Sequence, residues 1–426
     1  MIHRRRFGSP LPKNPSAKDA RSSIYLVCFM MLFWTLSEGM VSFIVPLRIA
    51  EAGFSDTMLG IIIGTSSIAG ALFDLVACRV FKNTFYKRIF GLMFILCLIF
   101  PLILMQATTL VAFVIGMAVW GIYWDLRNIG NFDYIARTTE KEGSVHAFGL
   151  VQVFQSIGWI LGPILVGFLA GEAVGWEPFA AIYIFLGLGI VFYVLLCLWK
   201  GNSKQKPELD ELEPCRRGSW SEARMMGLLA FALFPALFGI FFINFVDSFF
   251  WSIGPLFAEE LGLGVFAGLF MTAWSLPAIL LGWQAGKVAL KFGKERVAYG
   301  AQFLAVLCLI PIFLVSTIGI AVIALIFVAA SFTALAIPAY QSMFTDYIQE
   351  RKDLAKEIEG LEDLYTNLGY VFGPMLAGLS ADLLGYGQTF SLLGIVVGVA
   401  AALLYWANKN KKLAFHQKAP PLICDV

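Results

Sequence analysis

The sequence predicts an all-α membrane protein in which twelve transmembrane helices form two six-helix bundles. Three observations lead to this fold class. Apolar residues make up 59% of the 426-residue chain and charged residues only 14%, whereas a soluble domain carries about 25% charged residues. Apolar runs recur along the whole chain, and the second half repeats the pattern of the first. Open sheets would leave backbone groups unpaired in the bilayer, and the runs lack the alternation of a membrane barrel.

Each predicted helix is a mostly apolar run of the length that a bilayer requires, about 20 residues. The first run follows a basic segment and is too long for a cleaved signal peptide, so we expect it to be retained as a helix. The predicted helices lie at about 24–50, 57–78, 89–107, 110–132, 147–170, 179–199, 226–257, 265–286, 297–316, 320–345, 361–384 and 389–407. The expected domains are a basic N-terminal tail (1–23), a first bundle (24–199), a polar linker (200–224), a second bundle (225–407) and a C-terminal tail (408–426).

Basic residues fix the expected orientation, because the cytoplasmic loops of membrane proteins are rich in Lys and Arg. If both termini are placed in the cytoplasm, 29 of the 31 Lys and Arg residues fall on cytoplasmic segments, and the exceptions are Arg48 and Arg127. We therefore expect a protein of the plasma (cytoplasmic) membrane with both termini, the linker and the two tails on the cytoplasmic side. We also expect a monomer whose partners are the lipid bilayer, a small-molecule substrate and protons.

An internal repeat predicts that the two bundles are equivalent. Four residues of the fifth predicted helix recur in the eleventh at a constant offset of 211 positions. Glu38 of the first helix corresponds to Asp247 of the seventh, 209 positions later. Parallel repeats are typical of transporters in which two bundles rock about a site at the membrane midplane. The repeated residues are Gly158, Gly162, Pro163 and Gly167 in the fifth helix and Gly369, Gly373, Pro374 and Gly378 in the eleventh.

A motif at the end of the second predicted helix resembles a signature of the major facilitator superfamily, and with the topology this resemblance covers essentially the whole chain. The family's G-x-L-x-D pattern, followed by basic residues, reads Gly70-Ala-Leu-Phe-Asp74, with Arg79 as the first basic residue. The Arg that usually follows the Asp is replaced by Leu75. The resemblance implies that Asp74 locks the outward-open state by binding the N-terminal end of a helix in the other bundle. A solvated loop charge is the alternative.

The glycine–proline pattern of the fifth helix resembles a signature of the antiporters of the same family. Glycines four residues apart let helix backbones approach closely, and a proline bends the helix. We therefore expect a tight interface between the fifth and eighth helices and, from the repeat, between the eleventh and second. The resemblance implies antiport. Because the same spacing in the eleventh helix also serves repeat packing, symport stays open.

Charged residues inside the predicted helices need a reason, since a charge at the bilayer centre costs at least about 2.5–3.5 kcal/mol. Glu38 and Asp247 occupy equivalent places, and we expect them to face a central cavity from opposite walls. An apolar site disfavours the charged form of a carboxyl group, so a proton would neutralise the site while a cationic or polar substrate leaves. A hydrogen bond to a neighbouring helix for stability alone is the alternative.

Arg127 is the basic residue inside the fourth predicted helix. The antiporters of the resembled family often carry an arginine–glycine pattern at this place, and the resemblance implies that Arg127 modulates the proton site. A structural ion pair with Asp125, Asp133 or Asp74 is the alternative. Arg127 shares one helix face with Trp120, Tyr123, Trp124 and Asn131, and a face that holds an arginine does not point to lipid.

Aromatic and amide side chains are expected to line the cavity. Aromatic walls with a few hydrogen-bonding groups and acids suit an amphipathic or cationic organic molecule, through stacking and cation–π contact, and they also suit a sugar. The expected cavity residues are Trp34, Trp120, Tyr123, Trp124, Asn131, Gln152, Gln155, Asn244, Trp251, Tyr340, Gln341 and Tyr370.

The sequence contains no phosphate-binding loop, metal-ligand pattern or nucleophile motif, so we expect neither an enzyme nor a cofactor, a metal or a nucleic-acid partner. The leading hypothesis is a proton-coupled secondary transporter that exports an organic solute by alternating access. Proton-coupled symport of a sugar or other metabolite is the second hypothesis. A non-transporting membrane receptor or scaffold is the third.

Overall fold

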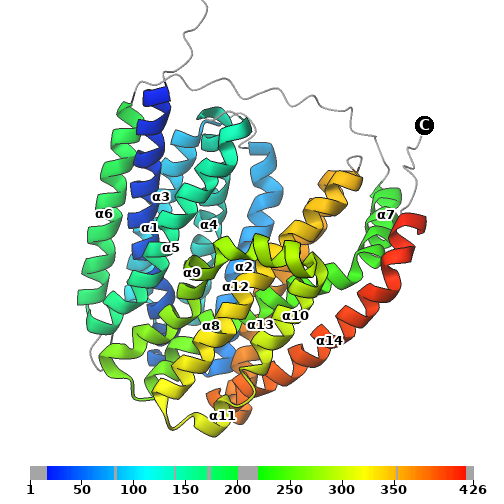
Figure 1. Ribbon diagram of the computed structural model, residues 1–426. Coiled ribbons are helices and arrows are strands. Elements are labelled where there is room, and N and C mark those ends of the chain that lie inside the picture. The colour runs from blue at the N-terminus through cyan, green and yellow to red at the C-terminus, as the bar shows by residue number, and fades with distance from the viewer. Residues whose placement is uncertain are drawn as a thin grey trace, which may run out of the picture.

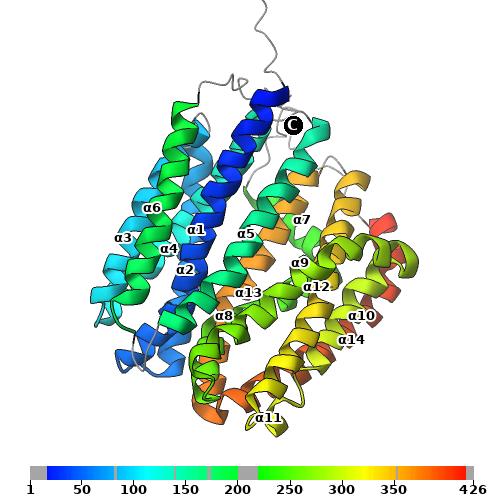
Figure 2. The ribbon, with the colours of Figure 1, turned by 60° about the vertical axis from the view of Figure 1, so that its left-hand side comes forward.

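The computed structural model describes residues 17–80, 84–138, 141–169, 174–199, 219–351 and 354–418, and within these ranges it contains helices and no strands. Figures 1 and 2 show two helical bundles side by side, the first coloured blue to green and the second green to red. Eleven helices of the described chain are long and apolar enough to cross a membrane. The predicted all-α membrane fold class is thus confirmed.

The first bundle contains α1 (Ala17–Glu51), α2 (Asp56–Val80), α3 (Tyr86–Gln106), α4 (Leu110–Thr138), α5 (Lys141–Leu169) and α6 (Glu177–Leu198). The second contains α7 (Ser219–Ala232), α8 (Phe234–Glu260), the short 3₁₀ helix η1 (Gly264–Phe266), α9 (Ala267–Phe292), α10 (Lys294–Leu307), α11 (Ile312–Val315), α12 (Gly319–Glu350), α13 (Ala355–Leu384) and α14 (Tyr386–Lys418).

Proline interrupts two helices that the sequence predicted to be continuous. The predicted helix at 226–257 is divided at Leu233 into α7 and α8, and Pro235 lies in the first turn of α8. The predicted helix at 297–316 is divided into α10, which ends at Leu307, and the short α11. Pro311 is the N-cap residue of α11. Proline lacks an N–H and disfavours the helical conformation of the residue before it, so each break falls just before a proline.

Several helix ends and one span differ from expectation. The helices α1 and α14 extend into the predicted tails, and α7 begins within the predicted linker. The other residues of the tails and the linker lie outside the described residues. The predicted span at 361–384 forms part of α13, which packs against α2 and α8. It is not among the eleven apolar spans because its sequence mixes acids with Tyr, Asn and Gly.

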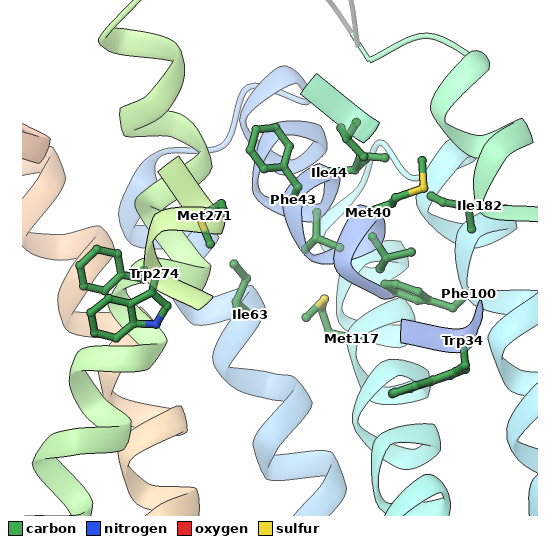
Figure 3. Packing of buried hydrophobic residues seen from close by; sticks show 14 of the residues in the cluster. Trp34, Met40, Phe43, Ile44, Ile63, Phe100, Met117, Ile182, Met271 and Trp274 are labelled. Carbon is green, nitrogen blue, oxygen red and sulfur yellow. The ribbon is translucent and has the colours of Figure 1, made fainter. Parts of the chain in front are cut away.

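The helices α1 and α8 lie at the centres of their bundles. The most apolar stretch of each is 67% buried, more than in any other described span. Figure 3 shows Trp34 and Met40 of α1 among Phe100 of α3, Met117 of α4 and Ile182 of α6, all fully or nearly fully buried. A charged group on such a helix lies deep inside the protein rather than at the lipid surface.

Each glycine–proline helix makes the interface that the sequence predicted, α5 with α9 and α13 with α2, and a second interface within its own bundle. In α5, a Cβ atom at Gly158 or Gly162 would strike α1, whereas Pro163 and Gly167 lie against the start of α9. The helix α13 repeats this division with α8 and α2 in the places of α1 and α9; its residues are Gly369, Gly373, Pro374 and Gly378. The first two glycines therefore hold each bundle together. Only the later part of each motif contacts the other bundle.

The two bundles approach each other most closely at one end of the molecule, which we call the closed end. A Cβ atom at Gly60 of α2 would overlap the Pro374 carbonyl, and one at Gly268 of α9 would overlap the Pro163 carbonyl. These contacts lie near the start of α2 and α9 and near the end of α5 and α13, at the bottom of Figure 1. The start of α1 and the end of α14 lie at the opposite end.

Hydrogen bonds to Asp382 add a latch at the closed end. The Asp382 carboxylate, near the end of α13, accepts the backbone N–H groups of Asp56 and Thr57 at 3.1 and 2.8 Å, and the Thr57 hydroxyl. The Tyr386 hydroxyl donates to the Asp56 carboxylate at 3.2 Å. A carboxylate at a helix N-terminus satisfies free N–H groups and interacts favourably with the helix dipole. Asp382 thus joins the first turn of α2 to the second bundle.

We expect Asp382→Asn to shift the conformational equilibrium toward separation of the bundles at the closed end by about fivefold, the effect of losing one charge-assisted hydrogen bond at an exposed site. Spin labels on cysteines introduced at the exposed positions Thr108 and Leu383, with the seven native cysteines replaced, report this separation. Glu350→Gln removes an acid at the opposite end of the molecule and is the control. An unchanged distance distribution in Asp382→Asn would contradict a latch role.

Candidate functional site

A cavity of about 830 Å³ lies between the two bundles. Residues of α1, α2, α4 and α5 form one wall, and residues of α8, α9, α12 and α13 form the other. Its lining reaches Asp74 at the end of α2, Phe132 of α4 and Asp363 near the start of α13, and Phe132 is 63% exposed. The cavity therefore extends from the closed end toward the end at which α1 begins and α14 ends.

The charges on the cavity wall are unequal. Four carboxylates line it and a single guanidinium opposes them; the acids are Asp74, Asp125, Asp247 and Asp363, and the base is Arg127. In the part of the chain that the structure describes, no lysine or arginine forms an ion pair with any of these four aspartates. The cavity is electrostatically suited to a cation, because low-dielectric walls strengthen the field of unpaired charges.

Glu38 is buried beside the cavity behind two indole rings. Its side chain, on the central helix α1, is 3% exposed and is not part of the cavity wall. Three donors of α4 converge on the carboxylate: the Trp124 indole at 2.8 Å, the Tyr123 hydroxyl at 2.9 Å and the Trp120 indole. Tyr123 and Trp124 follow Trp120 by three and four residues, about one helical turn, which places all three donors on one face of α4. The expectation that Glu38 faces the cavity directly is therefore corrected.

Asp247 is held in the same manner in the second bundle but lies on the cavity wall. The Trp274 indole of α9 donates to one carboxylate oxygen at 2.7 Å, and the Tyr370 hydroxyl of α13 donates to the other at 2.7 Å. Each bundle thus contains one carboxylate on its central helix, bonded by indole and phenol donors of neighbouring helices. Glu38 is covered by its donors, whereas Asp247 is accessible from the cavity.

Arg127 stacks on aromatic rings and forms no ion pair with a described residue. Its guanidinium carbon lies 4.6 Å from the ring centre of Trp124 and 5.3 Å from that of Trp34. Asp133, one of the ion-pair partners expected from the sequence, binds Arg137 at 2.7 Å instead. The Arg127 side chain also lines the cavity. The guanidinium is thus positioned by cation–π contact, and its charge acts on the nearby Glu38 carboxylate.

Three tryptophans form a continuous row across the cavity, which we call the tryptophan row. Trp124 of α4 stacks on Trp159 of α5 with ring centres 5.6 Å apart, and Trp159 meets the edge of Trp251 of α8 at 5.0 Å. All three line the cavity. The row crosses from the first bundle to the second, so a planar solute that stacks there would contact both.

Five of the expected cavity residues lie on the wall, namely Trp120, Trp124, Gln152, Trp251 and Tyr370. The other seven do not line it: Trp34, Tyr123, Asn131, Gln155, Asn244, Tyr340 and Gln341. Asn131 and Gln155 both point their amide groups at the Met31 sulfur, inside the first bundle. Tyr340 is buried in the second bundle, where its hydroxyl donates to Gln302. Asn131, Gln155 and Tyr340 are thus buried polar parts of the bundle interiors, whereas Gln341 is exposed away from the cavity wall.

The expected gating residues of the second helix lie at the cavity mouth. Gly70 and Asp74 both line the cavity, and a Cβ atom at Gly70 would approach the Asp125 carboxylate. Asp74 is repelled by Asp363 of α13, and no helix N-terminus among the described residues of the other bundle donates a hydrogen bond to it. The lock predicted for Asp74 would require this end to be shut, whereas here the cavity extends to Asp74. Arg79 lies in α2, and its side chain is outside the described residues.

Sequence reasoning missed three residues that shape the cavity: Trp159, Trp274 and Asp363. A single aromatic side chain in an apolar run is usually packing, so nothing distinguished the two tryptophans. Asp363 lies in an acidic segment of α13 that resembles a helix start facing solvent. Asp363 lies opposite Asp74 because α13 packs on α2. The repeat predicted this packing, but it did not show which residue of α13 would face Asp74.

The chain matches the sequence model of the Major Facilitator Superfamily over residues 27–355 and 236–422. It is 24% identical over 403 residues to the uncharacterized MFS-type transporter YqjV of Bacillus subtilis, covering 90% of this chain and 92% of that protein. It is 25% identical to Multidrug resistance protein 2 of the same organism, covering 66% of this chain and 70% of that protein.

Solved structures with the same fold include a bacterial homolog of the human lysosomal transporter Spinster in an inward-facing, unoccupied conformation. It has a TM-score of 0.73 and covers 94% of this chain and 98% of its own. The nucleoside transporter NupG has a TM-score of 0.64, with 92% and 98% covered. Both are 15% identical to this chain, so they show the fold alone.

Proposed function

This chain belongs to the Major Facilitator Superfamily, and from that premise we propose that it exports an organic cation in exchange for protons, by alternating access. Membership makes it an integral membrane transporter of small molecules rather than an enzyme. The direction, the coupling ion and the class of solute are our proposal.

The single observation that carries the proposal is the unequal charge of the cavity, four aspartates against one arginine. An anionic solute would meet repulsion from most of the wall, whereas a cation is attracted. Indole faces on the same wall add cation–π attraction and apolar contact, which suit an amphipathic cation of moderate size. The name of one relative, Multidrug resistance protein 2, agrees with export of such molecules.

Two carboxylates divide the work in this proposal. Asp247 is accessible and binds the cationic group of the solute, and Glu38 is covered and carries the proton. Taking up a proton removes the negative charge from a water-poor site, which changes how the donors of α4 are held. The positive charge of Arg127 attracts the ionised carboxylate of Glu38, and this attraction is lost when Glu38 takes up a proton. In this scheme the proton binds Glu38 and the solute binds Asp247, and binding of one disfavours binding of the other.

A second candidate function is proton-coupled uptake of a neutral polar solute. Ser66, Ser67, Asn128, Gln152 and Asn367 line the cavity and offer hydrogen bonds that a sugar or nucleoside would use. In that case the same proton site would drive solute inward. A receptor without transport, the third hypothesis from the sequence, disagrees with membership of a transporter family and would give no flux.

Flux measurements on the purified protein in proteoliposomes separate these functions. With an imposed pH gradient, we expect accumulation of a lipophilic cation such as tetraphenylphosphonium against its gradient, accompanied by release of protons to the opposite side. A panel of neutral sugars and nucleosides serves as the comparison set. Co-movement of a neutral solute and protons in one direction would support symport and contradict export. Absence of flux for every probe in both directions would contradict both.

A further inference from the structure

Trp124 has contacts that no other described residue of the cavity wall combines. Its indole N–H donates to Glu38 at 2.8 Å, and its ring stacks on Trp159 at 5.6 Å. The ring also carries the Arg127 guanidinium at 4.6 Å and meets the edge of Trp34 at 5.5 Å. Trp124 is partly exposed to the cavity, whereas Glu38 is not. It is therefore a direct physical connection between the covered carboxylate and the tryptophan row.

We propose that Trp124 is a positioning residue that transmits the protonation state of Glu38 to the tryptophan row, and thereby sets where a solute stacks in the cavity. The proposal rests on the proposed function in that Glu38 is taken as the proton site. It goes further by assigning one side chain, and one hydrogen bond, to the communication between proton and solute.

The chemistry of the carboxyl group supplies the signal. An ionised carboxylate only accepts hydrogen bonds, and bonds to it are roughly twice as strong as bonds between neutral groups. After protonation, one oxygen carries a proton and becomes a donor, so the three donors of α4 no longer find three equivalent acceptor sites. At least one of them must move or weaken its bond.

The packing around the three donors selects Trp124 as the one that moves. Tyr123 is 1% exposed and packed edge-on against Trp34 and Phe100. Trp120 is stacked on Phe100, with ring centres 5.8 Å apart and planes 14° apart. Trp120 and Trp124 both line the cavity, but of the three donors only Trp124 stacks on another wall residue, Trp159. A tilt of its ring changes the face that Trp159 presents, and Trp159 in turn contacts Trp251 of the second bundle.

Few titratable groups act on Glu38, which makes its charge a defined signal. Arg127 and Tyr123 act from α4, and Cys97 acts from α3. Among the described residues of the other helices that pack around α1, namely α2, α5, α6 and α8, no titratable group acts on the carboxylate. A pH-dependent change at Trp159 that requires Glu38 would thus report this carboxyl group.

Fluorine NMR of the full-length protein labelled with 5-fluorotryptophan tests the proposal without depending on transport. The Trp159 resonance is identified as the one lost in Trp159→Phe. We expect it to shift with pH in the wild-type chain and to stop shifting in Glu38→Gln. In Trp124→Phe, which keeps an aromatic ring but lacks the donor N–H, we expect most of the pH-dependent shift at Trp159 to be lost. Trp120→Phe is the matched control, because it removes a donor to the same carboxylate without touching the row, and it should keep the shift.

Three results would overturn the proposal: a Trp159 resonance that ignores pH in the wild-type chain, a full shift retained in Trp124→Phe, or an equal loss in Trp120→Phe. The proposed transport function fails differently. If the wild-type protein shows no proton-linked flux while the Trp159 shift depends on both Glu38 and Trp124, the export proposal is wrong and the connection through Trp124 stands.

Discussion

Glu38→Gln is expected to abolish accumulation of solute driven by a pH gradient, while the protein stays folded. Glutamine has the shape of glutamate, and its amide oxygen still accepts hydrogen bonds from the indoles of Trp120 and Trp124, but the amide cannot carry a proton. One-for-one exchange supports a solute ratio of about tenfold per pH unit, since one pH unit is worth 1.36 kcal/mol. We expect the ratio to fall to one in the variant, measured in proteoliposomes with the same imposed gradient.

The control for this prediction is Glu177→Gln, which removes an exposed acid in the first turn of α6. It should accumulate solute like the wild-type protein. Thermal unfolding of both variants in detergent shows that the loss in Glu38→Gln is not a loss of structure. Accumulation by Glu38→Gln at the wild-type ratio, with unchanged pH dependence, would show that Glu38 is not the proton site.

Gly60→Val is expected to force the bundles apart at the closed end. The first side-chain atom at this position would overlap the backbone carbonyl of Pro374, which is not able to move aside as a flexible side chain does. Overpacking of this kind costs about 1–3 kcal/mol, a shift of roughly five- to 150-fold in a conformational equilibrium. The contact joins two bundles, so separation of the bundles relieves it without unfolding either.

The spin-label pair at positions 108 and 383 measures this effect as a longer distance between the bundles. We also expect a large fall in transport rate, because the chain would no longer return to the state described here. Gly187→Val of α6 is the matched control, since open space surrounds a Cβ atom at that glycine. A wild-type distance distribution in Gly60→Val would mean that α2 and α13 do not approach as closely as their glycines allow.

The sequence predicted the helices and the equivalence of Glu38 and Asp247 because both depend on local composition and on the repeat. Of the twelve cavity residues that it suggested, only five reach the wall. A helical face shared by Trp120, Tyr123 and Trp124 shows that these side chains point inward, but the interior of a bundle and the space between two bundles look alike from one helix. Two of these rings cover Glu38, and this depends on the packing of α4 against α1, which no spacing along one helix reveals.

Other differences have local causes. The breaks before Pro235 and Pro311 carried a signal in the sequence, which the apolar runs around them concealed. Asn131 and Gln155 resembled solute ligands because amides are rare in spanning helices, yet both turn toward the sulfur of Met31. The same residue types form weak polar contacts inside a bundle and line a binding site. Residue type alone therefore does not distinguish a buried amide from a solute ligand.

The covered position of Glu38 has a consequence for how this chain would change over evolutionary time. Its three hydrogen-bond donors come from one helix and are packed against Trp34 and Phe100, which do not line the cavity. The wall around Asp247, in contrast, is built from four helices of the second bundle and lies open to the solute. If Glu38 is the proton site that we propose, mutations in that wall would alter which molecules are accepted while the proton reaction stays intact. A transporter arranged in this way would change its solute specificity by single substitutions without any change to its proton site.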